Sequence, residues 1–261
     1  MNMKQIHTIL VAGAIAAAGS MAQGGVIAAW DFQTTTTGGT AAVASAASGA
    51  ANTTPKVYVS NFGSGTLYLD GSNASSNFYL PATGGSNAEI NAFGGTSVNA
   101  DTSIGMSTVT GGAAALAIAG GASTGGVYSA NGKSMVFKFS MTGLSGLSIS
   151  YATQRTGTGF TSQVLEYSSN GSTWSSIGSN ASIQSSFSAT STPPGVATTF
   201  SGITGLDGAA TAYVRITLSG ATASSGNNRF DNFVFSATAV PAPGAAALIG
   251  LAGLITTRRR K

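Results

Sequence analysis

Carboxylates are the side chains of this chain that could perform acid–base chemistry. The 261-residue sequence contains no cysteine, and its single histidine, His7, lies close to the N-terminus. Without histidine and cysteine, Ser–His and Cys–His mechanisms are excluded for the remainder of the chain. Zinc sites are not expected there, because most of them need histidine or cysteine ligands. A carboxylate pair can hydrolyse a glycosidic bond. No local motif marks such a pair among the seven available: Asp31, Asp70, Glu89, Asp101, Glu166, Asp207 and Asp231.

Three oxygen-bearing residues near the ends of the body are candidate Ca²⁺ ligands, because Ca²⁺ prefers carboxylate and amide oxygens. Asp31 lies on the first predicted strand, and Asp231 and Asn232 lie on the last. They would meet if these two strands pair. The alternative is a structural Arg229–Asp231 ion pair or an Asx turn, since alternation puts Arg229, Asp231 and Phe233 on one face. No other cofactor is expected.

Aromatic side chains are candidate platforms for sugar rings. Tyr58, Tyr68 and Tyr213 fall on the polar parity of their predicted strands, which makes them candidate glycan contacts. Cross-strand packing is the alternative, because tyrosine is enriched in strands by propensity alone. The wider set of aromatic candidates is Tyr58, Tyr68, Tyr79, Tyr128, Tyr213 and Trp174.

The charge distribution argues against a nucleic-acid partner. The formal net charge is +4, from eleven cations and seven acids. Five cations lie at the extreme ends: Lys4, Arg258, Arg259, Arg260 and Lys261. The body therefore holds 11 − 5 = 6 cations against 7 acids, a net charge of −1. A near-neutral body lacks the basic surface that phosphate recognition requires.

Alternating apolar and polar residues predict strands throughout the body. In residues 135–141 every second side chain is apolar, whereas Lys138 and Ser140 face the other way. Asn170-Gly171 marks a hairpin turn, because this pair tolerates positive φ. The other predicted strands are 26–32, 57–62, 66–70, 77–80, 147–151, 165–168, 174–177, 212–218 and 230–236. Short strands at this spacing, low charge and no helical period predict an antiparallel β-sandwich.

Two segments extend this interpretation by resemblance. YSSNGSTWSSIGS and NNRFDNFVFSA resemble the jelly-roll domains of secreted bacterial adhesins and carbohydrate-binding proteins. This resemblance implies a jelly-roll-like sandwich in which the first and last strands pair.

The N-terminus has the three parts of a secretory signal peptide. Lys4 provides a positive charge, residues 9–19 are apolar, and Ser20-Met21-Ala22 offers small residues for cleavage. We expect signal peptidase to cut between Ala22 and Gln23, with Val26-Ile27-Ala28 as the alternative site. A buried N-terminal helix is the competing interpretation.

The C-terminus combines a proline pair, an apolar run and a basic cluster. Val240-Pro241-Ala242-Pro243 ends regular structure, because proline removes backbone donors. The apolar residues 244–255 would rise about 18 Å as a helix, less than the roughly 30 Å of a hydrocarbon core. Arg258, Arg259 and Arg260 would stay on the cytoplasmic side.

This three-part tail resembles the PEP-CTERM sorting signal, with Ala242 in place of the usual Glu. The resemblance implies recognition by an exosortase-like membrane protease and release or re-anchoring of the body. An ordinary short tail anchor is the alternative. Both interpretations place the body in the outer envelope or outside the cell, held transiently or permanently at the inner membrane.

The sequence thus predicts a signal peptide over residues 1–22, a β-sandwich over 23–239 and a sorting signal over 240–261. We expect a non-enzymatic surface or extracellular-matrix protein, with extracellular polysaccharide as its candidate partner. The alternative is a secreted carbohydrate-active hydrolase that uses paired carboxylates.

Overall fold

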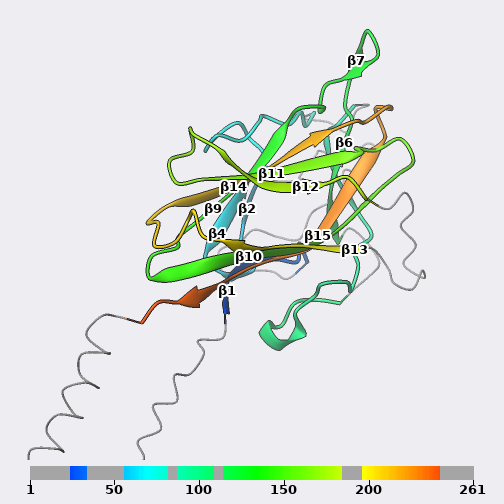
Figure 1. Ribbon diagram of the computed structural model, residues 1–261. Helices are drawn as coiled ribbons and strands as arrows, with labels where there is room; N and C mark the ends of the chain where they lie inside the picture. Colours follow the sequence, from blue (N-terminus) through cyan, green and yellow to red (C-terminus); the bar gives the residue numbers. More distant parts are fainter. Residues whose placement is uncertain (1–23, 34–55, 82–86, 109–113, 184–195, 242–261) are drawn as a thin grey trace, which may run out of the picture.

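Two antiparallel β-sheets pack face to face in the computed structural model (Figure 1). The structure describes residues 24–33, 56–81, 87–108, 114–183 and 196–241. The predicted antiparallel β-sandwich is therefore confirmed. The predicted signal peptide and C-terminal helix lie outside the described residues.

The seven-stranded sheet is organised around the last strand, β15. Its main path runs β13-β10-β15-β1-β3, and β6 pairs with both β15 and β5. The first and last strands pair as expected, with Gly25 opposite Ala237 and Trp30 opposite Phe233. The strands are β1 (Gly25–Trp30), β3 (Phe62–Gly63), β5 (Ile90–Phe93), β6 (Ala115–Ala119), β10 (Leu144–Arg155), β13 (Val196–Ile203) and β15 (Asn227–Ala239).

The six-stranded sheet has the order β12-β11-β14-β9-β4-β2. A separate hairpin of β7 (Ser123–Thr124) and β8 (Val127–Tyr128) projects from one end of the sandwich (Figure 1). The strands of the sheet are β2 (Val57–Val59), β4 (Gly65–Tyr68), β9 (Ser134–Phe139), β11 (Ser162–Ser168), β12 (Ser175–Asn180) and β14 (Ala212–Ser219).

The core between the sheets is dominated by aromatic rings. Phe137 of β9 lies 5.0 Å from the ring centroid of Trp30, 4.8 Å from that of Phe233 and 4.9 Å from that of Phe235. All four residues have no exposed surface. The alternation predicted for β9 is thus confirmed, because its apolar side enters the core while Lys138 points outward.

Some strand predictions were wrong or incomplete. Residues 77–80 form no strand, and only a single bridge joins Asn77 to Asp70. β5, β6 and β13 were missed, β5 because it has only four residues and β6 because its alanines give a weak strand signal. The 169–174 connection is longer than a tight turn: Gly171 has φ +72°, and Asn170 Oδ1 accepts from the backbone N–H groups of Ser172 and Thr173.

A β-bulge in β15 corrects the predicted facing of its side chains. Ser150 pairs with Val234 and Ala152 with Asp231, so Asn232 and Phe233 together oppose Tyr151. Asn232 has φ +50°, a left-handed conformation that asparagine tolerates better than most residues. The bulge resets the alternation, and Phe233 enters the core although Asp231 points away from it.

Helical structure is scarce in the part of the chain that the structure describes. The short 3₁₀ helix η1 (Thr102–Ile104) is capped by Asp101, whose side chain accepts from the Ser103 N–H. None of the described residues forms a helix with the length and apolarity needed to cross a bilayer.

Truncating Phe137, the ring that contacts Trp30, Phe233 and Phe235, tests this description of the core. Phe137→Ala should lower the free energy of unfolding by about 3–5 kcal/mol, because it removes buried ring contacts and leaves a cavity. Val127→Ala, at a position that is 65% exposed, should change it by less than about 0.5 kcal/mol. Urea unfolding followed by tryptophan fluorescence measures both, and equal effects would contradict the assigned core.

Candidate functional site

The outer face of the six-stranded sheet carries a row of aromatic and cationic side chains. The register places Tyr68 of β4 opposite Val136 of β9, and Lys138 of β9 opposite Tyr213 of β14. Tyr68, Lys138 and Tyr213 therefore project from three adjacent strands, all partly exposed. Two of the three predicted glycan contacts thus lie on one face.

Cations lie against the rings of this face. Lys138 Nζ lies 5.7 Å from the Tyr213 ring centroid and donates to Asn73 Oδ1 at 3.0 Å. Arg215 Cζ lies 4.2 Å from the Trp174 ring centroid, and Arg215 Nε donates to Glu166 Oε2 at 2.7 Å. Such cation–π contacts orient both partners.

A cavity of about 380 Å³ opens on this face beside β4 and β9. It contains both an aromatic ring, from Tyr68, and a cation, from Lys138. Its lining comprises Val59, Gly63, Ser64, Gly65, Thr66, Tyr68, Lys138, Phe139, Ser140, Ala210 and Thr211. Sequence reasoning did not select Lys138 as a site residue, although its outward parity was visible. We call Tyr68, Lys138, Tyr213, Trp174 and Arg215 the aromatic face.

Tyr58 does not belong to the aromatic face, so its prediction as an exposed glycan contact was wrong. It is only 3% exposed, and its ring packs edge-on against Phe32 at 5.6 Å. Tyr58 pairs with Leu67, a core residue, whereas Val59 is 44% exposed. The parity of β2 is thus inverted, with valines outward and tyrosine inward. Burial raises the pKa of the Tyr58 hydroxyl.

The three predicted Ca²⁺ ligands are brought together where β1 and β15 pair, and all are buried. The two oxygens of Asp31 accept from the backbone N–H groups of Gln33 and Ser107. Those of Asp231 accept from the N–H groups of Thr96 and Asn232.

The donor set at this position fits Ca²⁺ in kind. It contains two carboxylates, and the buried Asn232 Oδ1 has no hydrogen-bond partner within the described residues. Every carboxylate oxygen already accepts a backbone N–H, however, and the described residues contain no group of three or more metal-binding His, Cys, Asp or Glu side chains. The contacts themselves are those of loop-fastening carboxylates, and Ca²⁺ binding stays a prediction.

Asp231 has an unusual ionisation equilibrium. Burial raises its pKa well above the usual range, and the neighbouring Asp31 charge raises it further, while the N–H donors of Thr96 and Asn232 oppose the shift. Removing a carboxylate from water disfavours its charged form.

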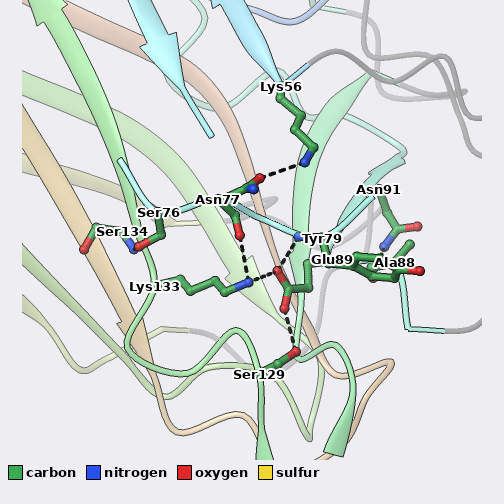
Figure 2. Close-up of polar contacts among 10 residues, drawn as sticks. All are labelled: Lys56, Ser76, Asn77, Tyr79, Ala88, Glu89, Asn91, Ser129, Lys133 and Ser134. Carbon is green, nitrogen blue, oxygen red and sulfur yellow. Dashed lines mark hydrogen bonds and ion pairs between the residues drawn. The ribbon is translucent and has the colours of Figure 1, made fainter. Parts of the chain in front are cut away.

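A third buried carboxylate, Glu89, is neutralised by a lysine (Figure 2). Glu89 Oε2 forms an ion pair with Lys133 Nζ and accepts the Tyr79 N–H at 2.6 Å. Its Oε1 accepts from Ser129 Oγ at 2.6 Å. Lys133 Nζ also donates to the Asn77 carbonyl at 2.9 Å. Both oxygens are thus engaged in joining the segment before β5 to the loops around β8.

The remaining carboxylates also have structural partners. Glu166 pairs with Arg215, and Asp207 accepts the Gly146 N–H. Asp70 and Asp101 each accept from a serine two residues later. Asp31 and Asp231 interact electrostatically, but both are buried rather than placed in an open cleft. No observation therefore favours the carboxylate-pair hydrolase.

The sorting residues lie at the edge of what the structure describes. Val240 is 53% exposed, and its N–H donates to the Gly143 carbonyl at 2.9 Å. Pro241 follows directly. The other sorting and cleavage residues lie outside the described residues: Ala22, Gln23, Ala242, Pro243, Arg258, Arg259 and Arg260.

Similar solved structures include both binding proteins and an enzyme. TmCBM61 in complex with β-1,4-galactotriose is 11% identical, covering 56% of this chain and 81% of that chain at a TM-score of 0.33. A family 29 carbohydrate-binding module from Piromyces equi is 11% identical, covering 59% and 83% at 0.32. A Stig cyclase, Fisc, from Fischerella sp. TAU is 12% identical, covering 74% and 90% at 0.34.

No family model and no curated protein sequence matches the chain. TM-scores as low as these describe a loose likeness, so the functional conclusions below rest on this chain's own residues.

The raised pKa of Asp231 predicts a specific pH dependence of stability. The folded chain binds the Asp231 proton more tightly than the unfolded chain, in which the pKa is about 3.9. The contribution of this group to the free energy of unfolding should therefore rise as pH falls from neutral through the raised pKa towards about 4. Asp231→Asn should remove this part of the profile, measured by thermal unfolding from pH 4 to 8.

Asp207→Asn is the matched control for the loss of one negative charge, at an exposed position. An unchanged pH profile in Asp231→Asn would contradict the assignment. The same two variants test the calcium hypothesis: if Ca²⁺ binds here, millimolar CaCl₂ raises the melting temperature of the wild type but not of Asp231→Asn, and EDTA reverses the effect.

Proposed function

We propose that this chain is an exported, non-enzymatic surface or matrix protein that binds polysaccharide through the aromatic face. One observation carries the proposal: Tyr68 and Lys138 line one cavity on a sheet face that also presents Tyr213 and Trp174. Ligand sites combine apolar and aromatic walls with a few well-placed polar groups, and this cavity has that composition.

The chemistry of the cavity suits a sugar chain. The Tyr68 ring offers an apolar surface to the C–H face of a pyranose. Lys138 Nζ and the hydroxyls of Thr66, Ser140 and Thr211 can bond sugar hydroxyls around that ring.

Preorganisation favours binding at this face. Lys138 is already held by Asn73, and Arg215 by Glu166 and the Trp174 ring. Side chains that are fixed before binding lose less conformational entropy when a ligand arrives. The six-stranded sheet also gives the rings a rigid support over several strands.

Export and sorting form the second part of the proposal. The body is secreted through the signal peptide of residues 1–22 and sorted through the PEP-CTERM-like tail of residues 240–261. The strand limits support this division, because β1 begins at Gly25 and β15 ends at Ala239. The two strands pair, so both ends of the body leave the same end of the sandwich (Figure 1).

Removal of the Tyr68 ring should weaken polysaccharide binding. Tyr68→Ala should lower affinity at least about tenfold, equivalent to roughly 1.4 kcal/mol, and Lys138→Met should lower it through the lost donor. Tyr79→Ala is the matched control, because Tyr79 is 52% exposed but does not line the cavity. Affinity electrophoresis in gels containing soluble glucans, galactans or mannans measures the effect. Binding by none of these polymers, or equal binding by Tyr68→Ala, would refute the proposed face.

Intact-mass spectrometry tests the processing. In a host with an exosortase, the exported protein should begin at Gln23 and lack the residues beyond the 240–243 segment. Replacing Arg258, Arg259 and Arg260 with alanine should leave the tail attached, and so should a host without exosortase. A wild-type mass that retains Met1 or the whole tail in the exosortase-containing host would contradict the sorting proposal.

A further inference from the structure

A second cavity, of about 300 Å³, lies on the seven-stranded sheet. The strands β5, β6 and β15 form its base. Ile90 and Ala92 of β5 belong to the hydrophobic core, so Asn91 and Phe93 point away from it. Its lining comprises Asn87, Ala88, Asn91, Phe93, Ala119, Ser224, Ser225 and Asn227. This volume lies at the small end of the range for ligand pockets, roughly 300–1,000 Å³.

The lining has the composition of a site for a neutral polyhydroxy ring. Three amides, two hydroxyls and one aromatic ring face the cavity, and the lining contains no carboxylate and no cation. Amides both donate and accept hydrogen bonds, as sugar hydroxyls do. Ala119 leaves room at the base of the cavity.

One side-chain acceptor of a lining residue has no hydrogen-bond partner. Asn227 is only 5% exposed, and its Nδ2 donates to the Ser225 carbonyl at 3.0 Å. Its Oδ1 has no hydrogen-bond partner within the described residues. A buried acceptor without a donor is unfavourable, so a small reorientation of the Asn227 amide towards a ligand hydroxyl would be stabilising.

The aromatic wall is fixed in position. Arg229 Cζ lies 4.5 Å from the Phe93 ring centroid, so the guanidinium packs against the ring. Phe93 is nevertheless 36% exposed. The Asn91 side chain is also held: its Nδ2 donates to the Ala88 carbonyl at 3.2 Å, and Glu89, next to Ala88, is anchored by Lys133 (Figure 2). The cavity is therefore preformed by contacts that lie beside it.

We propose that this cavity is a second saccharide site, which takes one neutral pyranose unit. The Asn91 and Asn227 amides bond its hydroxyls, and Phe93 packs against its apolar face. The aromatic face lies on the opposite sheet, so one molecule would bind two polysaccharide chains and link them. This linking role rests on the proposed function of the aromatic face, whereas binding at the cavity does not.

Side-chain amide resonances give a direct test at the cavity. The ¹⁵N-labelled full-length chain is titrated with glucose, galactose and mannose up to tens of millimolar. At least one sugar should shift the NH₂ signals of Asn91 and Asn227, and Phe93→Leu should weaken that response at least tenfold. Phe93→Leu keeps an apolar side chain and the β5 pairing, so its spectrum also reports folding. Absence of shifts at both amides with all three sugars would overturn the proposal.

The linking role is tested by turbidity of mixtures with a long-chain polymer that binds the wild type. Wild type should cluster the polymer, whereas Tyr68→Ala and Phe93→Leu should each abolish clustering. Tyr68→Ala should keep the amide shifts, and Phe93→Leu should keep binding in the gel. Amide shifts without polymer binding would overturn the proposed role of the aromatic face but not the saccharide site in the cavity. Clustering that survives Phe93→Leu would overturn the linking role.

Discussion

The pairing of β15 with three other strands is the constraint on which the rest of the structure depends. Its 13 residues hydrogen-bond to β1, β10 and β6. Its pairing with β1 brings the two ends of the body together. Its pairing with β6, which in turn pairs with β5, forms the base of the second cavity. Its bulge at Asn232 directs Phe230 and Phe233 into the core while Asp231 fastens the loop at Thr96. Without this bulge, one half of the strand would present its polar residues to the core.

Scarcity of charge shapes how this protein uses its few ionised groups. Only 7% of residues are charged, and the well-defined pairs do more than balance charge. Lys133 satisfies the buried Glu89, and Arg215 is shared between Glu166 and the Trp174 ring. Lys138 and Arg229 also lie against rings. Cations thus hold aromatic side chains in place on both sheets, which gives a surface of rings and hydroxyls rather than a charged one.

Much of this architecture could be predicted from local patterns. Residues 212–218 alternate cleanly, because one sheet face meets the core and the other meets solvent, and residues 135–141 do so except at Val136, which is also buried. The outward positions of Tyr68, Lys138 and Tyr213 follow from the same period. The prediction for Tyr58 was wrong because β2 has only three residues, and its two valines and one tyrosine are compatible with either side facing the core. β5 was missed because it is only four residues long, and β6 because an Ala-rich strand that is buried on both faces has little periodic contrast.

The sequence by itself determined the fold class, the near-neutral charge of the body and most strands. Residue composition and the alternation of apolar and polar residues are local properties that can be read without knowing which strands pair. Only the tertiary structure decided which strands adjoin, and therefore which side chains act together. Tyr68 and Tyr213 are far apart in the chain but become members of one face through the register of β9. Asn91 and Asn227 likewise line one cavity only because β6 lies between their strands. Long-range pairing, which no local period encodes, thus set both candidate sites.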